Sequence, residues 1–141
     1  GRPLEFHCTT PVRPNRAQKI LYGPTLQPYI YGELIGKALV AKSRLRPSWI
    51  VTDLPPVLAV REGLNCPAIC LVESTADDLL VGESETLGPF QVVASVRHVD
   101  DLAVMKRMWE LEPVEFDLWE PFERIRNAIQ ETQRARAARA A

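Results

Sequence analysis

Two apolar runs of the sequence, 49–51 and 68–72, each end at a cluster of oxygen-bearing side chains. These side chains belong to Thr52, Asp53, Glu73, Ser74 and Thr75. Carboxylates close to hydroxyls could bind a magnesium-type ion or serve as acid and base, and either arrangement suits the hydrolysis of a phosphate ester. Asp53 and Glu73 are therefore candidate catalytic residues, and the hydroxyl residues are candidate ligand-binding residues.

The two clusters meet in space only if the apolar runs are parallel neighbours in one sheet. Neither run alternates apolar with polar residues, which is typical of strands covered on both faces. The segment 55–65 between them opens with two prolines and has apolar residues at helical spacing, which predicts a short helix. About a dozen residues suffice for a parallel crossover, so we expect a βαβ unit over 48–74 with any ligand at the carboxyl ends of its strands.

A further strand is expected at 3–11, where apolar and polar residues alternate. If it joins the sheet in the same direction, its end brings Cys8, Thr9 and Thr10 to the same edge. Cys8 is then a candidate nucleophile, and the two threonines are candidate ligand-binding residues. His7 would point to the opposite face of the strand, so a base such as His98 would have to come from elsewhere in the chain.

The same residues also have ordinary structural interpretations. Asp53 could be the N-cap of the crossover helix, and Ser74 or Thr75 could form a turn. Cys70 lies in the middle of an apolar run, where a small buried side chain is expected. Cys66 lies four residues before Cys70, but the sequence has no C-x2-C partner and no nearby histidine pair, so we predict no metal site.

The proline-rich segment 11–28 is predicted to be a long loop, with room for a short turn of helix. Long loops inside compact domains often bind ligands or act as lids. Basic residues across 13–46, interleaved with tyrosines, could contact single-stranded nucleic acid. They are Arg13, Arg16, Lys19, Lys42, Arg44 and Arg46, with Tyr22, Tyr29 and Tyr31. The net charge of −1 for the whole chain argues against a dominant basic surface, so nucleic-acid binding is kept as an alternative.

Hydrophobic spacing predicts helices over 28–46, 100–112 and 117–133. Gly32 and Gly36 lie one turn apart in the first of these, which indicates close approach by a sheet or another helix. Short strands at 79–81 and 91–99 should form a hairpin joined by the loop between them. The predicted fold is a single α/β or α+β domain over 2–133, with a mixed, partly parallel sheet flanked by helices. The alanine- and arginine-rich end, 134–141, should be a fraying extension.

The composition restricts the class of protein to which the chain could belong, but it indicates no particular reaction. With 46% hydrophobic and 25% charged residues, and no apolar run long enough for a membrane span, the chain resembles an ordinary soluble protein. Three cysteines, an odd number in a chain that needs no disulfides, indicate a cytoplasmic setting. Residues 73–120 carry twelve acidic and three basic side chains, so they could pair within the chain or with a partner.

No complete catalytic set is visible, so the leading hypothesis is a non-enzymatic ligand- or protein-binding domain, as a homo-oligomer or with another protein. A metal-dependent hydrolase and a single-stranded nucleic-acid binder are the alternatives. No cofactor is indicated. The aromatic residues that could line an interface, or equally the core of the last two helices, are Tyr29, Tyr31, Trp109, Trp119 and Phe122.

Overall fold

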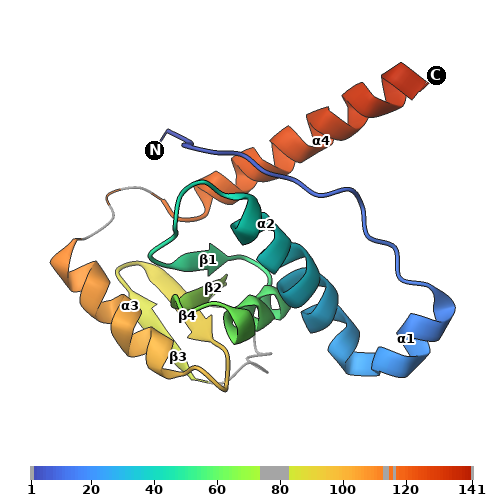
Figure 1. The fold of residues 1–141 in the computed structure, drawn as a ribbon. Helices are drawn as coiled ribbons and strands as arrows, with labels where there is room; N and C mark the ends of the chain where they lie inside the picture. Colours follow the sequence, from blue (N-terminus) through green and yellow to red (C-terminus); the bar gives the residue numbers. More distant parts are fainter. Residues whose placement is uncertain (1, 74–82, 113–114, 116, 141) are drawn as a thin grey trace.

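A four-stranded sheet forms the centre of the protein (Figure 1). The computed structural model describes residues 2–73, 83–112, 115 and 117–140. The strands are β1 (Ile50–Thr52), β2 (Ala68–Val72), β3 (Ser84–Leu87) and β4 (Phe90–Ala94), and their order across the sheet is β1-β2-β4-β3. The strand expected at 79–81 lies outside the described residues.

The parallel pair predicted from the two apolar runs is confirmed. β1 pairs in parallel with β2, and Thr52 lies opposite Cys70, whereas the other two strand pairs are antiparallel. The connection is η3 (Pro55–Gly63), a 3₁₀-helix rather than the expected α-helix. The sheet is therefore mixed and partly parallel, as predicted.

Helices cover both faces of the sheet. Ile69, Leu71 and Val92 point to the face covered by α3 (Asp100–Leu111) and by the residues that lead into α4 (Glu120–Ala140). Cys70 and Val93 point to the other face, which η3 covers. This two-sided burial explains why the β2 run has no polar residue, since a polar side chain on either face would lose its water.

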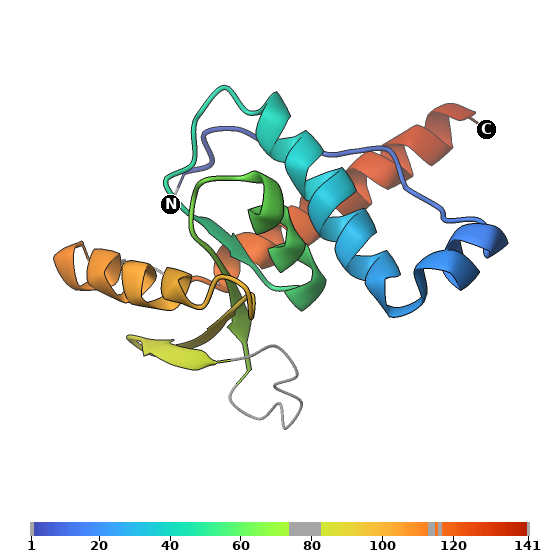
Figure 2. The ribbon, with the colours of Figure 1, turned by 60° about the horizontal axis from the view of Figure 1, so that its bottom comes forward.

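A third layer lies outside η3 (Figure 2). It consists of η2 (Pro28–Gly36), a π-helix, continued by α2 (Lys37–Lys42). The helix expected over 28–46 is therefore present, but it changes winding and ends at Lys42. A Cβ at Gly32 would lie 2.6 Å from the Cβ of Ala59 and 2.7 Å from the nitrogen of Val60. The glycine is needed because backbone packs on backbone here, which confirms the close approach inferred from the sequence.

The prediction of a strand at 3–11 is wrong. This segment is extended but forms no strand of the sheet. The inward side chain is Glu5, whose carboxylate accepts hydrogen bonds from Ser43 Oγ at 2.8 Å and from the Arg44 nitrogen at 3.1 Å. Leu4 and Phe6 are exposed, so the apolar side of the alternation is not buried as a strand of the sheet would require.

The segment 11–28 is largely helical rather than a loop. α1 (Arg16–Tyr22) is followed by the short 3₁₀-helix η1 (Gly23–Thr25). Asn15 and Gln18 form a capping box at the start of α1, in which each side chain accepts a hydrogen bond from the backbone nitrogen of the other. Gly23 ends the helix with a φ of 49°, a value that favours glycine.

The hairpin β3–β4 differs from the expected one in its boundaries. Its turn is Gly88 and Pro89, and Gly88 has a φ of 57°. The residues 84–87, expected in the connecting loop, form β3, and β4 ends at Ala94 rather than near Val99. The sequence pattern does not predict β3, because β3 is an edge strand with polar outer residues and only Leu87 of its side chains is fully buried.

α3 is the helix predicted at 100–112, whereas α4 begins at Glu120 rather than at 117 and continues to Ala140, past the predicted end at 133 and into the expected extension. Trp109 of α3 lies edge-on to Phe90, with ring centroids 5.9 Å apart, and Trp119 and Phe122 pack at the margin of the same core. These three aromatic side chains therefore belong to the core rather than to a free interface. The far end of α4 extends away from the sheet (Figure 1). Within the described residues, no helix has the length and apolar character needed to cross a membrane.

Candidate functional site

Asp53 and Glu73 follow the carboxyl ends of the parallel strands, as the sequence predicts, but Asp53 is paired with a cation. Asp53 directly follows the last residue of β1, and its carboxylate forms a hydrogen-bonded ion pair with Arg126 Nη1 of α4. The Asp53 side chain is only 19% exposed. This carboxylate therefore attaches α4 to the end of β1.

Asp53 is not the N-cap of the crossover helix, so this structural interpretation is wrong. Leu54 occupies the N-cap position, and no side chain caps it. Thr52 instead accepts a hydrogen bond from the Leu54 nitrogen at its Oγ1, over 3.1 Å. Because Thr52 is buried and its hydroxyl is used in this turn, it lies inside the fold rather than on an open edge.

The remaining candidates at this edge are spread out or lie outside the described residues. Glu73 is exposed, whereas Ser74 and Thr75 are not described. Over residues 2–73, 83–112, 115 and 117–140, no three His, Cys, Asp or Glu side chains converge as a metal site would require. The metal-dependent hydrolase therefore stays a prediction from the sequence.

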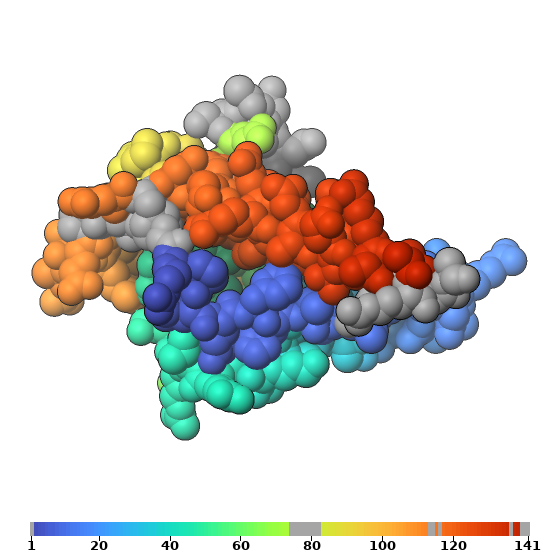
Figure 3. Space-filling model, turned by 90° about the horizontal axis from the view of Figure 1, so that it is seen from above, coloured from blue at the N-terminus to red at the C-terminus, as the bar shows by residue number. Residues whose placement is uncertain are grey.

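Cys8, Thr9 and Thr10 do not reach the edge by way of a strand. They lie in the extended N-terminal segment, which runs beside α4 and α2 (Figure 3). Cys70 is fully buried on the η3 face, and burial, with a smaller effect of the Asp53 charge, raises its pKa to about 12. Cys70 is therefore protonated and shielded at neutral pH, as expected for a structural cysteine.

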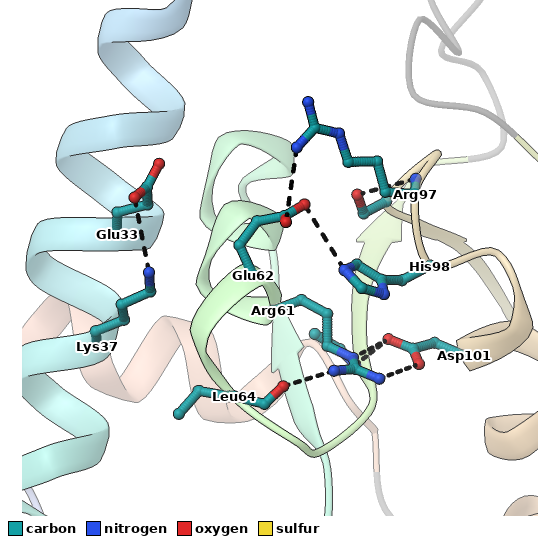
Figure 4. A network of polar contacts seen from close by, with 10 residues as sticks. Glu33, Lys37, Arg61, Glu62, Leu64, Arg97, His98 and Asp101 are labelled. Carbon is teal, nitrogen blue, oxygen red and sulfur yellow. Dashed lines mark hydrogen bonds and ion pairs between the residues drawn. The ribbon is translucent and has the colours of Figure 1, made fainter.

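A polar network that the sequence did not reveal lies at the opposite, amino end of β2 (Figure 4). Its centre is Asp101, which is only 4% exposed. The carboxylate accepts hydrogen bonds from Arg61 Nε at 2.9 Å and Nη2 at 3.3 Å, and from the Ala68 nitrogen at 3.0 Å. Arg61 also donates to the Leu64 carbonyl. One carboxylate thus joins η3, β2 and α3.

Glu62 extends this network towards solvent. Its carboxylate lies 3.6 Å from Arg97 Nη1 and 3.6 Å from His98 Nε2. The His98 Nε2 atom is buried and has no hydrogen-bond partner among the described residues. The sequence placed Asp101 only in the first turn of a helix, because its partners lie 33 and 40 positions away along the chain. No local signal could have identified them.

A shallow groove of about 560 Å³ lies between β3 and α3. Val99, Leu102 and Ala103 supply its apolar part, and charged residues supply most of the rest. The charged lining residues are Glu83, Glu85, Asp100, Lys106, Arg107 and Glu110. Four carboxylates against two cations give the groove an acidic character.

Glu85 closes part of the sheet edge beside this groove. Its Oε1 accepts a hydrogen bond from the Thr86 nitrogen at 3.1 Å, and Lys106 Nζ lies 3.1 Å from its Oε2. These two contacts, the backbone one being the stronger, lower the pKa of Glu85. The outward N–H of Thr86 is therefore already satisfied, which disfavours the addition of another strand here.

An exposed apolar pair lies at the opposite end of the molecule. We call residues 12–27, which include α1, the arm; they project from the body beside η2 (Figures 1 and 2). Ile20 is 71% exposed and Leu21 is 81% exposed. Three exposed basic residues of the arm, Arg13, Arg16 and Lys19, form no ion pair with any residue that the structure describes.

The comparisons with known proteins add nothing to this geometry. The chain matches no protein-family model, no curated protein and no solved structure. The contacts of the described residues are therefore the basis for any proposed function.

Tyr22 and Tyr29 stack on each other with ring centroids 4.7 Å apart, so each ring covers one face of the other. Nucleic-acid binding stays a prediction from the sequence.

Proposed function

We propose that the chain is a non-enzymatic protein-binding domain whose binding surface is the arm. The exposure of Ile20 and Leu21 carries this proposal. Single exposed apolar residues are common, but two adjacent large ones on a projecting helix leave most of their surface in water. Covering them would remove that apolar surface from water, at about 25 cal/mol for each Å² buried.

The charge of the arm defines the chemistry of its partner. Between Glu5 and Glu33 the sequence contains no acidic residue, whereas Arg13, Arg16 and Lys19 surround the apolar pair. A complementary surface would combine an apolar depression with carboxylates at its rim, because paired charges at the rim of an interface orient the partners and speed their encounter. The partner is therefore a protein with an acidic, partly apolar groove.

The charged groups elsewhere support binding rather than catalysis. Asp53 is paired with Arg126, and Asp101 is paired with Arg61 and with the Ala68 nitrogen. Groups held in this way fix the positions of α4, η3 and α3. These ion pairs therefore stabilise the body of the protein, from which the arm projects.

Site-specific photo-cross-linking tests this function. A photoreactive phenylalanine analogue placed at position 21 should yield a covalent adduct of defined mass in cells that express the protein, and mass spectrometry would identify the polypeptide attached. The matched control is the same analogue at exposed Gln130 of α4, far along the chain from the arm. Equal or absent adducts at the two positions would contradict a binding role for the arm.

A further inference from the structure

We propose that the partner is a second copy of this chain, and that the arm of each copy docks into the groove between β3 and α3 of the other. This inference rests on the proposed binding function and names the partner. The arm and the groove are complementary in charge, but within one copy the fold holds them apart.

The two surfaces lie at opposite ends of the molecule. The arm lies beside η2, on the far side of η3 from the sheet, whereas the groove lies between the edge strand β3 and α3 (Figures 1 and 2). The arm therefore does not cover the groove of its own chain. A second copy is the occupant that supplies the arm without any further component.

The charges of the two surfaces are complementary. Three carboxylates line the groove and form no ion pair with any described residue, namely those of Glu83, Asp100 and Glu110. The three cations of the arm likewise form no ion pair with any residue that the structure describes. Val99 and Ala103 provide apolar contacts for Ile20 and Leu21, above the largely buried Leu102 at the floor of the groove. Opposed charges at the rim and apolar contacts at the centre are the arrangement of a specific interface.

The groove is suited to a helix rather than to an added strand. Glu85 already accepts the Thr86 N–H, so an incoming strand would find this donor of the β3 edge occupied. α1 has seven residues and is about 10 Å long, so its side chains can enter a groove of this volume.

Reciprocal docking produces a closed dimer. One arm in one groove makes a small contact, whereas exchange of both arms across a two-fold axis doubles the buried area and leaves no docking surface unused. The assembly therefore stops at two copies.

Light scattering coupled to size exclusion tests the dimer with the full chain. The wild type should elute with twice the mass of one chain, and R16E/K19E, E83K/E110K and I20S/L21S should each raise the dimer dissociation constant about tenfold or more. The controls are K42E/R46E, a matched charge reversal away from the arm, and L45S; both should remain dimers. Circular dichroism and melting temperature establish that each variant folds.

Mixing the two reversed variants gives the decisive result. The reversed arm of R16E/K19E meets the reversed groove of E83K/E110K, and the two unchanged surfaces also meet, so the mixture should form a heterodimer although neither variant dimerises alone. A monomeric wild type, dimers unaffected by these substitutions, or a mixture that stays monomeric would overturn the proposal. If position 21 then cross-links to a different protein, the binding function stands and only the second copy is excluded; without any adduct, both fail.

Discussion

Replacing Asp101 by alanine should destabilise the protein more than any surface substitution, because it removes the carboxylate that pairs with the largely buried Arg61 and the acceptor of the buried Ala68 nitrogen. The Arg61 side chain is 19% exposed and the Asp101 side chain 5%, so water cannot replace the lost carboxylate fully. Removing one partner of a buried ion pair costs about 3–5 kcal/mol. The Ala68 nitrogen, left without an acceptor, contributes about 1–3 kcal/mol of that loss.

Urea unfolding followed by circular dichroism measures this effect and separates its parts. We expect Asp101→Ala to lower the free energy of unfolding by about 3–5 kcal/mol. Asp101→Asn should cost less, because its amide oxygen can still accept the Ala68 N–H. In an Arg61→Met background the cost of Asp101→Ala should fall to about 1–3 kcal/mol, since only the backbone donor is then left without its acceptor.

The double-mutant cycle can refute this reasoning directly. If Asp101→Ala costs the same in both backgrounds, within about 0.5 kcal/mol, Arg61 and Asp101 are not coupled and the charge is stabilised by other groups. A loss below about 1 kcal/mol for Asp101→Ala alone would mean that the network is exposed to water. The matched control is Glu62→Ala, which removes the half-exposed carboxylate of the adjoining residue and should cost about 1 kcal/mol or less.

Three other predictions follow from packing and titration. Gly32→Ala should lower the free energy of unfolding by about 1–3 kcal/mol or more, because the added methyl group would meet the backbone of η3. Gly63→Ala should lower it less, since its methyl group meets only the flexible end of the Lys37 side chain. Thermal melting compares the two variants, and equal losses of stability would contradict the close packing at Gly32. Cys70 should resist Ellman's reagent at pH 8 in the native protein and react after unfolding, because burial raises its pKa to about 12. Its contribution to stability is complete below the ordinary thiol pKa and is lost as the pH rises towards 12, and rapid labelling of the native protein would refute this burial. Hydrogen bonds from His7 and then Ser43 lower the pKa of Glu5, so its contribution to stability is present above the ordinary carboxyl pKa and is lost as the pH falls through the lowered value. The Arg44 N–H, which donates to Glu5, should therefore lose protection against exchange on acidification in the wild type, relative to its intrinsic exchange rate at each pH, and should have low protection at all pH values in Glu5→Gln.

The sequence predicted the elements whose burial follows from local pattern. The apolar runs at 49–51 and 68–72 imply strands covered on both faces, and the connection between them is too short for anything but a compact crossover, so the parallel pair could be derived. The acidic start and apolar side of 100–112 likewise predicted α3. In each case, residues close together in the sequence are sufficient to predict the element.

The errors arose where a distant residue decides the local structure. Alternation at 3–11 predicts a strand, but Glu5 is the inward residue because Ser43 and Arg44 bind its carboxylate. At the expected site, Asp53 is held by Arg126, which lies 73 positions later. The tertiary fold decides which distant residues become these partners, and the local sequence pattern does not reveal them.

The π-helical winding of η2 constrains the length of the chain there. The backbone N–H of Lys37 donates to the Gly32 carbonyl, five residues back, as well as to the Leu34 carbonyl, and the π-helix holds about one more residue per hydrogen-bonded turn than an α-helix would. Deleting one residue between 28 and 36 would rewind the helix and turn a side chain, in place of Gly32 or Gly36, towards Val60. Relatives of this chain should therefore carry their gaps in the connection at 46–48, beyond the residues that bind Glu5, and keep the π-helix at constant length.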